Sequence, residues 1–175
     1  MNLPNILTVI RFILIPIFGF YLLSGQYTAA VILFILGGVT DVADGYIARK
    51  YNLITSWGKL ADPIADKLMQ ITAVVILTVQ GKVPVAILTI VIAKELLMGL
   101  GSVLLYKNKR HIVSASWYGK MATVIFYIAV AAIIVFSLNS MYNTIFIGVA
   151  VISTLFAFFM YLQTYIKISN RVDKV

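Results

Sequence analysis

The sequence predicts an all-α integral membrane protein, a bundle of six transmembrane helices with both termini in the cytoplasm. Two observations favour this fold class. The chain of 175 residues is 62% hydrophobic and 11% charged, whereas a soluble domain averages about 45–50% apolar and about 25% charged residues. Its apolar residues also form six runs, each close to the roughly 20 residues that cross a bilayer. This excess of apolar residues is too large for one small core, so the predicted solvent is lipid.

The predicted spans are separated by short breaks that contain Gly, Pro, Ser or Asn. They cover residues 6–23, 27–48, 60–80, 83–106, 118–137 and 142–166. Helices are expected rather than strands, because an open sheet edge is not tolerated in lipid. The length and the uniform composition predict one membrane domain over residues 1–175, without a separate soluble domain.

The basic residues predict which connections face the cytoplasm. Lys82 is the only Lys or Arg in the breaks 24–26, 81–84 and 137–140, whereas basic residues gather near 49–59 and 107–117 and at the C-terminus. Because connections rich in Lys and Arg stay in the cytoplasm, both termini are expected there. The net charge of +8 then indicates contact with anionic lipid headgroups rather than with nucleic acid. The absence of Cys excludes a thiolate metal site.

Four of the six acidic residues fall within 26 residues of one another. Asp41 and Asp44 are spaced i, i+3 on the second predicted helix, and so share one face. Asp62 and Asp66 are spaced i, i+4 on the third. Because the connection between these helices is short, we expect the two pairs to meet near the cytoplasmic boundary of the membrane. Buried carboxylates are costly unless paired or bound to metal, and oxygen ligands favour Mg²⁺ or Mn²⁺, with room for two ions.

Small residues surround these acids. Gly45 and Ala48 lie on the second predicted helix, and Gly58 lies at the start of the third. They either permit close helix packing or let a bulky ligand approach the backbone. Arg49 either neutralises a phosphate or anchors its helix on the cytoplasmic side. The residues themselves leave both alternatives open.

Residues 41–66 read DVADGYIARKYNLITSWGKLADPIAD and match the spaced pattern D-x2-D-G-x2-A-R-x8-G-x3-D-x3-D. By this pattern the chain resembles the CDP-alcohol phosphatidyltransferase family, and eight fixed positions in register make a chance match negligible. The opening LPNILTVIRFILIP resembles the family's N-terminal segment, with Asn5, Thr8 and Arg11 in their usual places. The likeness covers most of the chain and is strongest over 1–70. The stretch LADPIADKLM most resembles the branches that make phosphatidylglycerophosphate and cardiolipin.

The resemblance implies roles for the matching residues. Asp41, Asp44 and Asp62 are expected to bind metal. Asp66 is expected to complete the second metal site and to act as the general base, taking the proton of the acceptor hydroxyl, while the ions neutralise the pyrophosphate and stabilise the departing CMP. The expected contacts of CDP-diacylglycerol are Asn5, Thr8, Arg11, Gly45, Ala48, Arg49, Thr55 and Gly58. A homodimer is also implied.

The acceptor alcohol is less well defined. In the branch that accepts glycerol 3-phosphate, the fourth span usually has an Arg before its Glu and a second Arg eight residues later, where this chain has Lys94 and Ser102. A later pair of lysines is reduced to Lys120, with Ala122 in the second place. The candidates for binding the acceptor's phosphate are basic residues, namely Lys59, Lys67, Lys94, Lys120 and Arg110. Because Lys94-Glu95 lies within an apolar span, it is either functional or a structural ion pair.

We expect transfer of the phosphatidyl group of CDP-diacylglycerol to glycerol 3-phosphate, giving phosphatidylglycerophosphate and CMP. The two missing arginines favour, as an alternative, a cardiolipin-synthase-like enzyme that uses phosphatidylglycerol; inositol phosphate and serine are further acceptors. A different class is a cation transporter with an aspartate-lined ion path. Transporters commonly have internal repeats and acids near the bilayer midplane, and neither is evident here. We expect a multi-pass protein of the cell membrane whose active site faces the cytoplasm.

Overall fold

Six helices account for most of the residues described in this computed structural model. In chain order they are α1 (Leu3–Leu23), α2 (Tyr27–Lys50), α3 (Ser56–Val79), α4 (Val85–Lys107), α5 (Trp117–Phe136) and α6 (Ser140–Val172). The structure describes residues 2–51, 53, 55–107, 117–136 and 139–172, with the backbone alone at 56, 59, 100–107, 140 and 164–172. Within these ranges no residue is in a strand, so the predicted all-α class is confirmed.

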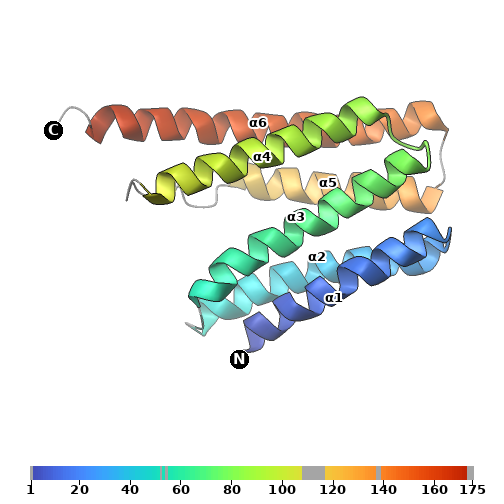
Figure 1. The fold of residues 1–175 in the computed structure, drawn as a ribbon, viewed down its shortest axis with the longest axis horizontal. Helices are drawn as coiled ribbons and strands as arrows, with labels where there is room; N and C mark the ends of the chain where they lie inside the picture. Colours follow the sequence, from blue (N-terminus) through green and yellow to red (C-terminus); the bar gives the residue numbers. More distant parts are fainter. Residues whose placement is uncertain (1, 52, 54, 108–116, 137–138, 173–175) are drawn as a thin grey trace.

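Four helices of the described part are long and apolar enough to cross a membrane. They are α1, α2, α5 and the segment Met141–Gln163 of α6, and with them the chain is a multi-pass membrane protein. The start of α1 and the end of α6 lie at the same end of the bundle (Figure 1). This arrangement agrees with an even number of crossings. Six crossings and cytoplasmic termini stay predictions.

The helix ends follow local sequence signals. Gly25 and Gly81 have φ angles of 72° and 71° at the turns after α1 and α3, in the left-handed region that glycine enters without a steric penalty. The third helix begins at Ser56, four residues before the predicted span, because the hydroxyl of Thr55 caps it by accepting a hydrogen bond from the backbone N–H of Gly58. Helix α6 continues to Val172, six residues beyond the end of the predicted span 142–166.

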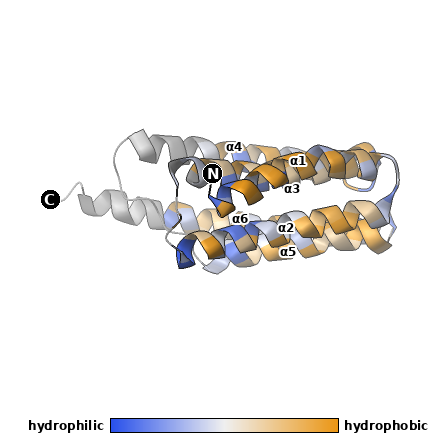
Figure 2. Ribbon diagram, turned by 90° about the horizontal axis from the view of Figure 1, so that it is seen from below, coloured by the Kyte–Doolittle hydropathy of each residue, from blue (hydrophilic) through white to orange (hydrophobic). Residues whose placement is uncertain are grey.

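The helices pack in a consistent order. Helix α1 contacts α2 and α3. Helix α2 also contacts α5, and α4 contacts α3 and α6. In Figure 2, α1, α3 and α4 form one row and α2, α5 and α6 the other. Stacked rings join the two rows: Phe18 and Phe34 have centroids 5.3 Å apart, and Phe34 and Tyr127 have centroids 4.6 Å apart. The stack therefore connects α1, α2 and α5 through the core.

Polar residues gather at one end of this apolar bundle. Figure 2 shows hydrophilic segments near the marked N-terminus, whereas the opposite half of the helices is mostly hydrophobic. The last turns of α2 and the first turns of α1 and α3 lie at this end (Figure 1). Asp41 and Asp44 lie in the half of α2 toward this end, and Asp62 and Asp66 lie in the half of α3 toward it.

Candidate active site

The two pairs of aspartates face one another between α2 and α3. The carboxylate of Asp41 is close enough to Asp62 and Asp66 for electrostatic repulsion, and that of Asp44 is close enough to Asp62. Spacing places each pair on one face of its helix, and the short connection between the helices makes them neighbours. The structure thus brings together the four residues proposed from the sequence as metal ligands.

Arg11 lies among these carboxylates. Its side chain is fully buried, and its guanidinium forms ion pairs with Asp41, at 2.8 Å, and with Asp44. Asp44 is buried as well, whereas the side chain of Asp41 is one-third exposed. A guanidinium offers several donors in a fixed plane, which suits binding two carboxylates at once. Arg11 therefore ties α1 to α2. Its predicted contact with the CDP-lipid stays a prediction.

Four residues proposed to surround the nucleotide lie together where α1 meets the start of α3. The hydroxyl of Thr8 donates to the carboxylate of Asp62. The hydroxyl of Thr55 donates to the Oδ1 atom of Asn5 at 2.9 Å and accepts from the N–H of Gly58, also at 2.9 Å. A Cβ atom at Gly58 would lie 3.0 Å from the Asn5 oxygen. Gly58 therefore allows these polar groups to approach its backbone closely.

Asp66 is held by two residues that the sequence did not single out. The side-chain amide of Gln70 donates to its Oδ2 atom at 2.9 Å, and the hydroxyl of Tyr127 donates to its Oδ1 atom at 3.1 Å. Gln70 is four residues after Asp66, and this spacing was a usable signal. Tyr127 is 61 residues away on α5, and the sequence holds no signal that pairs it with Asp66.

Two of the proposed acceptor-binding lysines meet at one glutamate. Lys67 on α3 and Lys94 on α4 form ion pairs with Glu95 at 3.1 and 2.5 Å. Lys94 and Glu95 are almost fully buried, and Lys67 is one-third exposed. Lys94 is also close enough to Asp66 for electrostatic attraction. The formal charges of the three side chains sum to +1 beside the proposed base.

The other proposed residues lie around this centre or outside the described part. Gly45 and Ala48 are half-buried on α2, and Arg49 is exposed near its end. Lys120 is exposed on the first turn of α5. The side chain of Lys59 and the whole of Arg110 lie outside the described residues.

The carboxylates suit a hard divalent ion by their chemistry, although their described positions do not form a complete metal site. Among the described residues, no group of three or more His, Cys, Asp or Glu side chains is close enough to hold a metal ion. Arg11 lies between Asp41 and Asp44, and Thr8 contacts Asp62. Arg11 pairs with only two of the four carboxylates. The cluster therefore keeps an excess of formal negative charge, which oxygen-binding cations neutralise well.

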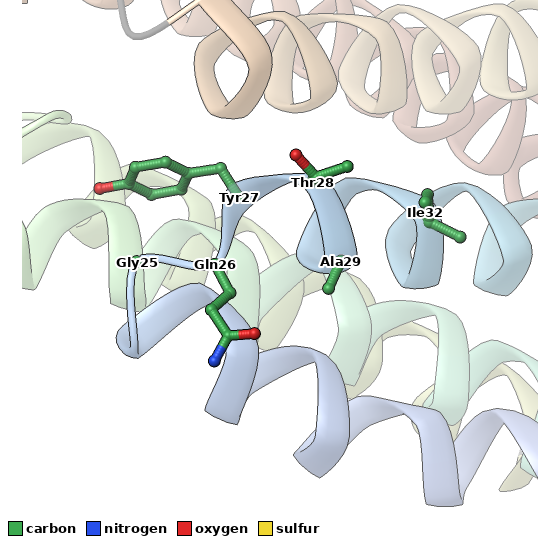
Figure 3. A pocket seen from close by; sticks show the side chains of 6 residues that line it. All are labelled: Gly25, Gln26, Tyr27, Thr28, Ala29 and Ile32. Atoms are coloured by element: carbon green, nitrogen blue, oxygen red, sulfur yellow. The ribbon is translucent and has the colours of Figure 1, made fainter.

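An open hollow lies at the other end of the bundle. It is lined by residues at the turn between α1 and α2, namely Gly25, Gln26, Tyr27, Thr28, Ala29 and Ile32 (Figure 3). Asp41 and Asp44 lie in the other half of α2, and Asp62 and Asp66 lie on α3. The hollow is therefore separate from the acidic cluster.

Comparisons with known proteins identify the family of this chain. The sequence model of the CDP-alcohol phosphatidyltransferase family matches residues 1–160. Proteins named CDP-diacylglycerol–glycerol-3-phosphate 3-phosphatidyltransferase are similar to the chain: that of Bacillus subtilis is 36% identical over 78% of each chain, and that of Haemophilus influenzae 32% over 93% of this chain and 92% of the relative. The Rickettsia felis protein of that name is 43% identical over 55% of each. Since the match spans nearly the whole length, this chain belongs to the CDP-alcohol phosphatidyltransferase family of enzymes.

Proposed function

We propose that this enzyme transfers the phosphatidyl group of CDP-diacylglycerol to glycerol 3-phosphate, releasing CMP. The observation that carries the proposal is the position of Asp66. It lies between the acidic cluster of α2 and α3 and the Lys67–Glu95–Lys94 group, which offers positive charge for an acceptor that is itself a phosphate. Relatives that align over most of the chain are named for both substrates.

The reaction needs a nucleophile in line with the leaving group, and a base that removes the proton of the nucleophile. Asp66 removes the proton of the acceptor hydroxyl. The resulting oxygen attacks the phosphorus that bears the diacylglycerol, the bond from that phosphorus to the CMP oxygen breaks, and CMP leaves. Asp66 is suited to this step because Gln70 and Tyr127 each hold one of its oxygens. Each oxygen keeps a free lone pair for the proton.

We propose Mg²⁺ or Mn²⁺ as the cofactor, as two ions held by Asp41, Asp44, Asp62 and Asp66. When bound, such ions neutralise the pyrophosphate of the donor and the charge on the departing CMP. Asn5, Thr8, Thr55 and Gly58 supply short polar groups for the nucleotide, and Gly45, Ala48 and Arg49 line the same side of α2. This assignment is supported by the convergence of the carboxylates at the polar end of the bundle.

The membrane location follows from the substrates. CDP-diacylglycerol has a hydrated polar headgroup and apolar acyl chains, so its reacting phosphorus lies at the membrane boundary. The acidic cluster lies in the halves of α2 and α3 toward the end of the bundle that holds the N-terminus (Figure 1). We propose that this end faces the cytoplasm, that the protein resides in the cell membrane, and that it forms a homodimer.

The test of the acceptor is CMP release by the purified enzyme. We expect release from CDP-diacylglycerol with Mg²⁺ or Mn²⁺ to depend on glycerol 3-phosphate, with phosphatidylglycerol, inositol phosphate and serine inactive. The product should extract as phosphatidylglycerophosphate, and excess EDTA should stop the reaction. Release that depends on phosphatidylglycerol would instead assign the enzyme to the cardiolipin branch. Folded protein that releases no CMP with any of these acceptors would contradict the proposal.

Replacing Lys94 by Met tests the acceptor site. We expect the KM for glycerol 3-phosphate to rise about tenfold, because a charge-assisted hydrogen bond contributes about 1.5–3 kcal/mol and each 1.4 kcal/mol changes affinity about tenfold. The KM for CDP-diacylglycerol should stay within about twofold of wild type, since one contact to the acceptor is lost. The measurement is initial CMP release over a matrix of both substrates.

Lys50→Met is the matched control, because Lys50 is exposed near the same end of the bundle and lies beside Tyr46 and Tyr51. It makes the same chemical change outside the proposed site and should leave both KM values unchanged. If Lys94→Met lowers thermal stability without altering either KM, Lys94 is a structural partner of Glu95 instead.

A further inference from the structure

We propose that Tyr127 is a positioning residue of this reaction, whose hydroxyl fixes the orientation of the Asp66 carboxylate. The inference rests on the proposed function, in which Asp66 is the general base. It adds a residue from α5 to the surroundings of Asp66, whereas the sequence pattern that contains Asp66 lies on α2 and α3. Three contacts of the tyrosine carry it.

The first contact is the hydrogen bond itself. The hydroxyl of Tyr127 donates to Oδ1 of Asp66 at 3.1 Å, while the amide of Gln70 donates to Oδ2 at 2.9 Å. One donor comes from α5 and the other from the aspartate's own helix. Two donors on opposite oxygens oppose rotation of the carboxylate plane, whereas a single donor leaves it free to turn. Together they define where the remaining lone pairs point.

The second and third contacts fix the ring. Phe34 stacks on Tyr127 with centroids 4.6 Å apart and planes inclined by 23°. On the same helix, Gly38 lies so close that a Cβ atom there would be 2.9 Å from the Cε1 atom of the tyrosine. The hydroxyl is therefore placed by the packing of α2 against α5, independently of its own hydrogen bond. An orienting group needs this rigidity, because a supporting residue that moves cannot hold its partner.

A purely structural reading of the same contacts also exists. A buried tyrosine hydroxyl needs a hydrogen-bond partner, and Asp66 could simply satisfy it. The two readings predict different kinetics. A positioning residue changes the rate of the chemical step, which is sensitive to misplacement of the reacting groups. A structural residue changes stability and the amount of folded enzyme.

The test begins with Tyr127→Phe, which removes the hydroxyl and keeps the ring. We expect kcat to fall about tenfold, a typical effect for a residue that supports a reacting group. Both KM values should stay within about twofold, because the residue acts on the chemical step rather than on substrate binding. The midpoint of thermal unfolding should change little. Tyr21→Phe is the matched control, since Tyr21 is half-buried against the same core on α1, and its kcat should equal that of wild type.

A second variant separates orientation from loss of a hydroxyl. Gly38→Ala keeps Tyr127 intact but pushes on its ring, so kcat should fall here too. In the Tyr127→Phe background, Gly38→Ala should lower kcat no further, because no hydroxyl remains to be displaced. Such non-additivity is the signature of residues that act as one unit.

Three results would overturn the proposal: an unchanged kcat in Tyr127→Phe, a loss fully explained by less folded protein, or full additivity with Gly38→Ala. Asp66→Asn distinguishes the failures. If Asp66→Asn is inactive while Tyr127→Phe is normal, the positioning role fails and the proposed function stands. If Asp66→Asn is active, the role of Asp66 as base fails as well.

Discussion

Replacing Asp66 by Asn is expected to lower kcat about a thousandfold, the middle of the range for loss of a general base. The amide has nearly the same shape as the carboxylate and still accepts a hydrogen bond from Tyr127, but it does not take a proton from the acceptor hydroxyl. The measurement is CMP release at saturating CDP-diacylglycerol and glycerol 3-phosphate. Because the resemblance also gives Asp66 a role in binding metal, a titration with Mn²⁺ should be run on the same protein.

Asp173→Asn makes the same chemical change close to the C-terminus and should leave kcat unaltered. If Asp66→Asn retains near-normal turnover with metal bound, Asp66 is not the base. If it loses turnover and Mn²⁺ binding together, and saturating Mn²⁺ restores the rate, its role is that of a ligand.

Replacing Arg11 by Met is expected to destabilise the metal-free protein by about 3–5 kcal/mol, the usual cost of removing one partner from a buried ion pair. Asp44 is then left buried without its counter-charge, and Asp41 loses a contact of 2.8 Å. A divalent ion that binds these carboxylates supplies the missing charge, and a ligand that binds the folded state stabilises it. Mg²⁺ or Mn²⁺ should therefore raise the unfolding midpoint more in Arg11→Met than in wild type.

The measurement is thermal unfolding in detergent with EDTA and across a series of ion concentrations. Lys82→Met is the matched control, because its ammonium lies 3.8 Å from the ring centre of Tyr27 at the opposite end of the bundle. It should show a stability change that does not depend on the ion. Equal responses of Arg11→Met and wild type to the ion would place the metal away from Asp41 and Asp44.

The sequence predicted the helices and the acidic cluster because both depend on local information. Long apolar runs determine where helices occur in lipid, and the i, i+3 and i, i+4 spacings determine which acids share a face. The short connection after α2 then brings Asp41 and Asp62 near each other. The errors at the helix ends are also local: Thr55 caps α3 before its apolar run begins, and α6 continues past its own run to Val172.

The contacts between distant helices were not predictable in the same way. Arg11 is 30 and 33 residues from its two carboxylate partners, and Tyr127 is 61 residues from Asp66. Helices that are apolar on most sides give no periodic signal that orients one against another. Arg11 could be recognised as a site residue by resemblance, but its pairing with Asp44 required the structure. The meeting of Lys67 with Glu95 across α3 and α4 is a contact of the same kind.

The hydrogen bond from Tyr127 to Asp66 also bears on how the enzyme is made. A chain emerges from the ribosome with its N-terminal part first, so α1 to α3, with all four clustered aspartates, enter the membrane early. Glu95, which binds Lys67, arrives with α4, and the hydroxyl that holds Asp66 arrives later with α5. The nascent chain therefore carries the clustered aspartates before the Tyr127 hydroxyl that binds Asp66 has been made. On the roles proposed above, a chain that ends before α5 has the four aspartates but lacks the hydroxyl that orients Asp66.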